Sequence, residues 1–232
     1  MGKRALPIAL LFNAAMLFAQ PPQTGDAMMN MQDIAQGLGV KCEYCHAGQR
    51  MGAAATPTPG TAPTHVDIAR AMIAMTRDLN AKILAATGKP ASETTRVTCM
   101  TCHRGVAIPG QLADIITKTA LQKSPEEAVG QYRDLRAQYY GRDSYDFGED
   151  TLLNAAQQIV RVKPPASIPI LRLNLEFYPR SVRSLTQIAF AYTRALDDEA
   201  AIATLEKALE IEPDNGMVKG QLEQLKSYRR RK

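Results

Sequence analysis

Two runs of sequence decide how this chain is interpreted: CEYCH at residues 42–46 and CMTCH at residues 99–103. Both have the spacing C-x-x-C-H, and together they use all four cysteines and two of the three histidines in the 232 residues. Two thiols at this spacing can each form a thioether with one vinyl group of the same haem, and the next imidazole can bind its iron. The sequence therefore predicts two covalent c-type haems. The expected thioether cysteines are Cys42, Cys45, Cys99 and Cys102, and the expected iron ligands are His46 and His103.

Three other uses of the cysteine pairs fit the sequence less well. A zinc site would need the two pairs at a short spacing, and it gives no reason for a histidine after each pair. Two structural disulfides would also leave both histidines unexplained. A thioredoxin-like motif should follow a strand in a βαβ unit, and no such pattern is present.

The sixth ligand of each iron is expected among the methionines, of which the chain has ten. One expected helix, residues 25–38, contains Met28 and Met31. A second, residues 65–86, places Met72 and Met75 on one face of an amphipathic pattern, with Thr64 as N-cap and Gly88 after its end. A methionine on such a face is usually packing filler, so its role as a ligand rests on the neighbouring haem motifs. His65, the third histidine, is an alternative axial ligand, although its position suits the start of a helix.

The segments around both motifs resemble a known family. MQDIAQGLGVKCEYCH at residues 31–46, ARAMIAMTRDLN at residues 69–80 and VTCMTCHRG at residues 97–105 are similar to haem-binding segments of the cytochrome c subunit of photosynthetic reaction centres. The resemblance covers about residues 26–110. It implies that a methionine on the helix before each motif is the axial ligand. On that basis Met31 is assigned to the His46 haem and Met72 to the His103 haem, with Met28 and Met75 as their rivals.

The chain also departs from that family. The reaction-centre subunit carries four haems in two such halves and usually has a lipid-anchored N-terminus. Here there is one half, and no cysteine lies near the N-terminus. The resemblance thus supports the fold and the haem chemistry and leaves a photosynthetic or a respiratory role open.

The first residues are expected to be a targeting segment. Lys3 and Arg4 precede an apolar stretch up to Ala19, which is typical of a signal peptide covering residues 1–19. An uncleaved N-terminal membrane anchor is the alternative. Export to the periplasm or another oxidising compartment is the expectation.

The C-terminal half has the pattern of a helical repeat. Pro179 and Pro213 are one tetratricopeptide period apart, and small and large apolar residues between them suit helix pairs. Ser124-Pro125 opens an expected helix that is rich in tyrosine and runs to about Tyr140. Pro164-Pro165 should start another helix, and residues 216–229 should form a capping helix. Residues 148–232 are therefore expected to be a tetratricopeptide-like repeat domain.

The predicted fold is mainly α, with a small diheme cytochrome domain (residues 20–110), a helical connector (111–147) and the repeat domain. The expected function is transfer of single electrons between donor and acceptor proteins, with a protein partner at the repeat domain and association with a membrane complex. Net charge is +5, too mild to indicate nucleic-acid binding. No catalytic constellation is found, so the chain is expected to be an electron carrier and not an enzyme. The alternative is a peroxidase-like haem enzyme, should one iron have an open face.

Overall fold

The structure is a computed structural model that describes residues 30–46 and 63–231. These residues form helices and connecting loops, and no strand occurs among them. The predicted signal peptide and Met28 lie outside the described residues. The elements are α1 (Met31–Leu38), α2 (Glu43–His46), α3 (His65–Thr87), the 3-10 turn η1 (Ala91–Glu93), α4 (Cys99–His103), α5 (Leu112–Gln122), α6 (Pro125–Tyr139), α7 (Glu149–Val162), α8 (Pro164–Phe177), α9 (Val182–Arg194), α10 (Asp198–Ile211) and α11 (Gly216–Arg229).

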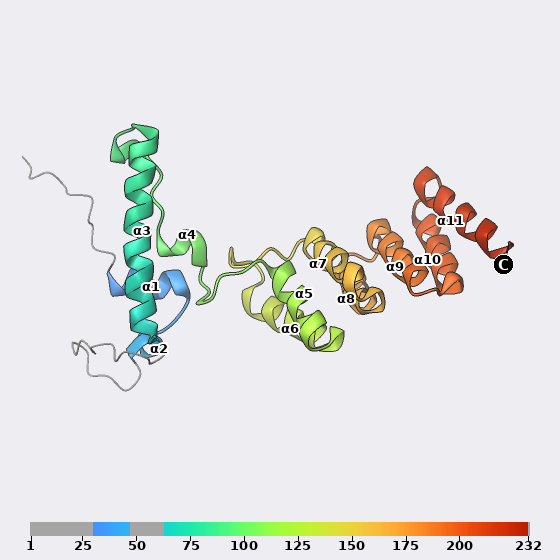
Figure 1. The fold of residues 1–232 in the computed structure, drawn as a ribbon, viewed down its shortest axis with the longest axis horizontal. Coiled ribbons are helices and arrows are strands. Elements are labelled where there is room, and N and C mark those ends of the chain that lie inside the picture. Colours follow the sequence, from blue (N-terminus) through green and yellow to red (C-terminus); the bar gives the residue numbers. More distant parts are fainter. Residues whose placement is uncertain (1–29, 47–62, 232) are drawn as a thin grey trace, which may run out of the picture.

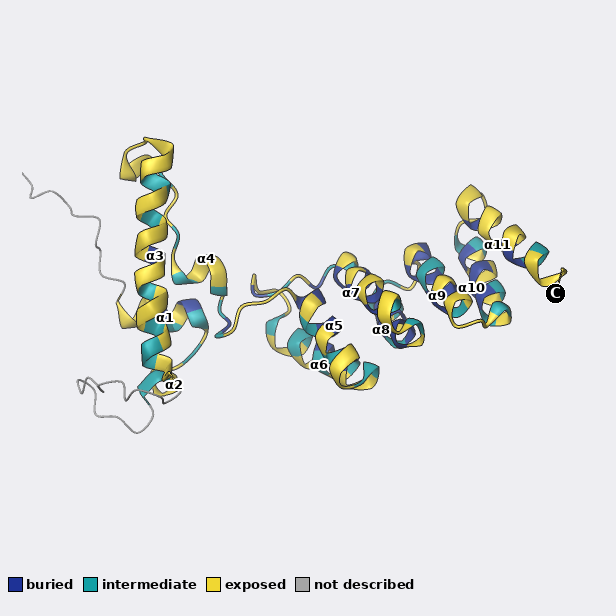
Figure 2. Cartoon of the chain, in the orientation of Figure 1, coloured by how far each residue is buried: buried dark blue, intermediate teal, exposed yellow. Residues whose placement is uncertain are grey.

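Helices α1, α2 and α4 lie near the long helix α3 at one end of the molecule, and α5 to α11 form a row that leads away to the C-terminus (Figure 1). The two parts differ in burial. All three clusters of buried apolar residues lie in the row, between Leu112 and Leu225. In α3, by contrast, Thr76 is the one buried residue, and most of the helix is exposed (Figure 2). The fold is mainly α, as the sequence predicts.

Local signals fix the ends of α3 and α6 where the sequence predicts them. The Thr64 side chain accepts a hydrogen bond from the backbone of Asp67, and the Asp67 carboxylate accepts one from the Thr64 backbone, which completes a capping box. Gly88, with φ of 63°, ends α3 in the left-handed conformation. At α6, the Ser124 hydroxyl caps the Glu127 amide, as expected. The helix predicted over residues 25–38 is described from Met31 onward.

The row is built from helix pairs that share buried side chains. The stretch predicted as a connector forms α5 and α6, and their buried residues pack with those of α7 and α8 around the fully buried Tyr132. Helix α8 begins at Pro164 and α11 covers 216–229, both as predicted. A further cluster joins α7 and α8 to α9, and the last joins α9, α10 and α11. Among the described helices, none combines the length and the apolar character that a membrane span requires.

The two parts of the molecule meet at the end of α4. The Ser144 hydroxyl, in the loop between α6 and α7, donates a hydrogen bond of 2.7 Å to the Arg104 carbonyl. Ser144 is buried, and so is Val106, two residues beyond Arg104. The backbone just after the second C-x-x-C-H motif is therefore bonded to the helix row.

Candidate haem-attachment site

Each C-x-x-C-H motif folds as a short helix. The first spans α2, with Cys42 just before it, and the second coincides with α4. In a helix, residues three apart lie on one side, so the Cys99 and Cys102 thiols are on the same side of α4. None of the four cysteines takes part in a disulfide, and all are exposed or half-buried. The disulfide interpretation therefore has no support in the structure.

The zinc interpretation also lacks support. Across residues 30–46 and 63–231, no three His, Cys, Asp or Glu side chains gather into a group that could hold a metal ion. The two cysteine pairs are consequently not brought together around one centre. The two Cys-Cys-His sets are therefore separate candidate sites, one at each motif.

Local bonds hold α4 in place. The Thr98 amide donates to the Thr101 hydroxyl at 3.0 Å, which closes the N-terminal turn of the helix. Arg104 ends the helix with φ of 49° and its amide bonded to the Met100 carbonyl. Burial against the neighbouring helix raises the pKa of the Cys99 thiol.

The His103 ring is held by a hydrogen bond at one of its two nitrogens. Its Nδ1 lies 3.0 Å from the Val106 carbonyl oxygen. A carbonyl oxygen can only accept, so Nδ1 carries the proton and donates it. The lone pair of a neutral ring is then on Nε2, and a bond of this kind fixes the ring orientation of metal-bound histidines in proteins. His103 is thus prepared to bind a metal through Nε2.

Two glycines let α1 pack on the second motif by its backbone. A Cβ atom added at Gly37 would lie 2.8 Å from the Cβ of Cys99, and one at Gly39 would overlap the Gly105 carbonyl. The Gly105 amide donates to the Gly37 carbonyl at 2.9 Å. Gly39 also has φ of 65° and ends α1 in the left-handed conformation. The segment that precedes the first motif is therefore fixed against the second motif.

One face of α3 presents a stripe of apolar side chains that stay partly exposed among the described residues. Ile68, Met72, Met75 and Leu79 recur at steps of three and four residues, and each is between 41% and 52% exposed. The apolar edge of a haem is the type of surface that such a stripe would cover. The chemistry of this face and of the adjacent Cys-Cys-His sets therefore fits covalent haem.

The C-terminal half of α3 is hydrogen-bonded to the segment that leads into the second motif. Asn80 Nδ2 donates to the Val97 carbonyl at 2.8 Å, and the Val97 amide donates to Asn80 Oδ1 at 2.8 Å. Val97 lies two residues before Cys99, so this pair of bonds sets the position of α4 relative to α3. Asn80 lies in a segment that resembles the reaction-centre subunit, and the sequence pattern predicts no role for it. The one feature of the sequence that could have indicated this role is an amide side chain directly after Leu79 of the apolar stripe.

The near end of α3 contacts the first motif. The His65 ring stacks on Tyr44, with ring centroids 4.2 Å apart and planes at 3°. His65 Nδ1 lies 2.7 Å from the Tyr44 carbonyl and donates to it. His65 therefore opens α3 and also holds the loop of the first motif. Its Nε2 points to no described hydrogen-bond partner.

The helix contacts run crosswise between the motifs. Helix α1, which carries Met31, packs on α4, and α3, which carries Met72 and Met75, packs on α2. Met72 is about 10 Å along the helix axis from His65 and about 12 Å from Asn80, so it lies between the points at which α3 contacts the two motifs. Met75 is nearer to Asn80. Met31 is 67% exposed at the start of α1.

The comparisons with known proteins agree with this chemistry. No curated protein sequence matches the chain. Residues 61–174 match the family described as the photosynthetic reaction centre cytochrome C subunit. The matched segment includes α3, the motif at residues 99–103 and helices α5 to α7, with most of α8. It begins after the motif at residues 42–46 and extends well beyond residue 110, the end of the resemblance seen in the sequence.

Proposed function

We propose, on the premise that this chain belongs through residues 61–174 to the photosynthetic reaction centre cytochrome C subunit family, that it transfers single electrons by means of two covalently attached haems. When bound, such a group supplies an iron that cycles between its ferrous and ferric states. The observation that carries the proposal is the bond from His103 Nδ1 to the Val106 carbonyl, beside two cysteines that form no disulfide.

The roles of the cysteines and histidines follow from their spacing. Cys99 and Cys102 would form the thioethers of one haem and His103 would bind its iron through Nε2. Cys42, Cys45 and His46 would do the same at the first motif, which lies outside the family match. The support for this second haem is the repeated C-x-x-C-H pattern and the same short helical form of both motifs.

We assign the axial positions to Met31 for the His46 haem and to Met72 for the His103 haem, with Met28 and Met75 as their rivals. The exposed side chains of Met72 and Met75 support a ligand role for α3, because a methionine that only filled a core would be covered by protein. Because α1 packs on α4 and α3 packs on α2, the test also covers the reverse assignment, with Met31 on the His103 haem and Met72 on the His46 haem. His65 remains the nitrogen alternative at the first motif, and its Nδ1 bond leaves Nε2 available.

The row of helices offers a surface for a redox partner. Two adjoining hollows of about 410 and 540 Å³ run over α7, α9 and α11, and both are lined by Phe190 and Gln221. Phe190 is 53% exposed. Exposed aromatic and glutamine side chains suit an extended peptide, whose backbone amides need partners. We therefore propose that this surface, of tetratricopeptide-repeat type, docks the chain on a protein partner or a membrane complex.

Export fits this role, since c-type haem carriers with an N-terminal targeting segment act outside the cytoplasm. We accordingly propose a periplasmic location, with residues 1–19 as a signal peptide and an uncleaved anchor as its alternative. A peroxidase-like activity is the second candidate function, and it requires one iron without a sixth protein ligand.

The visible spectrum and the haem count per chain test these proposals. The protein is expressed together with the haem-attachment machinery and compared with Cys99→Ala/Cys102→Ala and with Met72→Leu. Two acid-stable haems per chain are expected, falling to one in the double variant. Met72→Leu should lower the methionine-to-iron charge-transfer band to about half, because the His46 haem keeps Met31 as its ligand, and Met75→Leu is the matched control on the same stripe. A high-spin signal that shifts with carbon monoxide in the unmodified protein would support the enzyme instead. Absence of covalent haem would refute both.

A further inference from the structure

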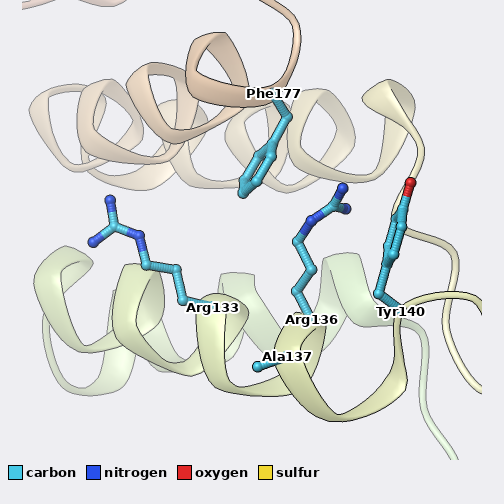
Figure 3. Close-up of a pocket in the computed structure, with 5 residues that line it drawn as sticks. All are labelled: Arg133, Arg136, Ala137, Tyr140 and Phe177. Atoms are coloured by element: carbon cyan, nitrogen blue, oxygen red, sulfur yellow. The ribbon is translucent and has the colours of Figure 1, made fainter.

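A second site lies outside the haem-attachment region, between α6 and α8. A pocket of about 510 Å³ is lined by Arg133, Arg136, Ala137, Tyr140 and Phe177 (Figure 3). Neither the proposed electron transfer nor the groove over α7, α9 and α11 uses these residues. The pocket combines two cations with two aromatic rings, a composition that suits an anion with an apolar body.

The guanidinium of Arg136 is held between aromatic faces. Its central carbon lies 3.9 Å from the ring centroid of Tyr140 and 4.2 Å from that of Phe177, with Phe147 at 5.7 Å. Figure 3 shows Arg136 between Phe177 and Tyr140. With both faces of the plane occupied by rings, a ligand can approach only along the edge, where the N–H groups point.

The charge of Arg136 is not neutralised within the described part of the chain. No carboxylate forms an ion pair with it there, and its Nη1 is buried without a hydrogen-bond partner. The hydroxyl of the fully buried Tyr132 likewise has no partner within hydrogen-bond distance. Burial raises the pKa of Tyr132, and the charge and hydrogen bonding of Arg136 act in the opposite direction, so this hydroxyl lies beside the guanidinium.

The neighbouring Arg133 behaves differently. Its Nη2 donates to both carboxylate oxygens of Glu176, at 2.8 and 2.9 Å. Arg133 is therefore neutralised and forms a wall of the pocket, and Arg136 supplies its single uncompensated positive charge. One negative charge on the ligand would balance the site.

We infer that this pocket binds a monocarboxylate that carries an apolar group, with the carboxylate on the edge of the Arg136 guanidinium and the apolar part against Phe177, Tyr140 and Ala137. The planar fork of a guanidinium matches the two oxygens of a carboxylate. Such a group could be a small metabolite or the last residue of a protein partner, which share this chemistry. The site is independent of haem and goes beyond the proposed function.

Calorimetric titration of the full-length protein with benzoate tests the inference, with benzamide as the neutral probe of equal shape. Benzoate is expected to bind and benzamide not to bind. Arg136→Gln should weaken benzoate about tenfold to a hundredfold, the usual effect of losing a charge-assisted pair. Arg136→Lys should recover only part of this, because an ammonium lacks the fork. Arg172→Gln, at an exposed arginine bonded to Tyr192, is the matched control and should bind benzoate normally.

Tyr140→Ala keeps the test decisive if the Arg136 variants do not fold, because Tyr140 is 64% exposed and outside the buried cluster. It should weaken benzoate as well. A peptide ending in phenylalanine, with a free or an amidated C-terminus, separates the two sources: tighter binding than N-acetylphenylalanine indicates a protein partner, and equal binding a small molecule. Equal affinity for benzamide, no effect of the Arg136 and Tyr140 variants, or no binding of any carboxylate probe would each overturn the inference.

Discussion

Replacing Gly37 by alanine sets two physical effects against each other. Alanine favours a helix over glycine by up to about 1 kcal/mol, so propensity alone predicts a more stable protein. The added Cβ would, however, lie 2.8 Å from the Cβ of Cys99 and 3.1 Å from the Met100 amide nitrogen. Overpacking of this kind costs about 1–3 kcal/mol. The net expectation is a loss of about 1 kcal/mol at the contact between α1 and α4.

Hydrogen exchange of the Gly105 amide reports this contact directly, because that amide donates to the Gly37 carbonyl. A loss of about 1 kcal/mol should speed its exchange roughly fivefold. Gly130→Ala is the matched control: Gly130 is an exposed position within α6, and nothing lies within 4 Å of an added Cβ. It should stabilise its own helix and leave Gly105 unchanged. Unchanged or slower exchange of Gly105 in Gly37→Ala would refute the packing of α1 on the second motif.

Two further predictions concern α3. Asn80→Ala should lose two hydrogen bonds to Val97, worth about 0.5–1.5 kcal/mol each, and should raise the exchange rate of the Val97 amide. Asn80→Asp keeps the acceptor for the Val97 amide but places a carboxylate oxygen against the Val97 and Thr76 carbonyls, so it should also raise this exchange rate. Equal exchange in all three proteins would contradict the clamp. Hydrogen bonds from the Thr64 side chain and then its backbone hold the pKa of Asp67 below its ordinary value. Asp67 therefore contributes stability above its ordinary pKa that is lost as pH falls through the lower folded-state pKa. In Thr64→Val an NMR titration should show the Asp67 pKa moved up towards that ordinary value, and an unmoved pKa would rule out the cap as its main cause.

What the sequence predicted correctly was local. The ends of α3 at Thr64 and Gly88 depend on residues within one helical turn, so a single sequence contains the whole signal. The haem-attachment prediction is equally local, since five consecutive residues carry each motif, and it stays a prediction. The start of α8 at Pro164 follows for the same reason, because proline suits the first turn of a helix.

What the sequence did not predict depends on contacts between distant segments. Gly37 and Gly39 look like helix breakers in the sequence, and only the folded chain shows that they admit Cys99 and Gly105. Helix α5 has a weak pattern because small residues such as Ala120 form much of its buried face. The sequence identified the Tyr-rich end of α6, but the enclosure of Arg136 by rings needs Phe177 from another helix.

The hydrogen bond from Ser144 to the Arg104 carbonyl bears on how such a chain can be recombined during evolution. A boundary at residue 110 would suggest two interchangeable modules, and exchanging the helices after it for an unrelated array would leave Ser144 and Val106 without their buried neighbours. The family match, which runs from residue 61 to residue 174, crosses this joint. The segment that matches the family accordingly contains the second motif together with the first helices of the row, and we expect insertions or module swaps to be tolerated beyond residue 174 more readily than at residue 110.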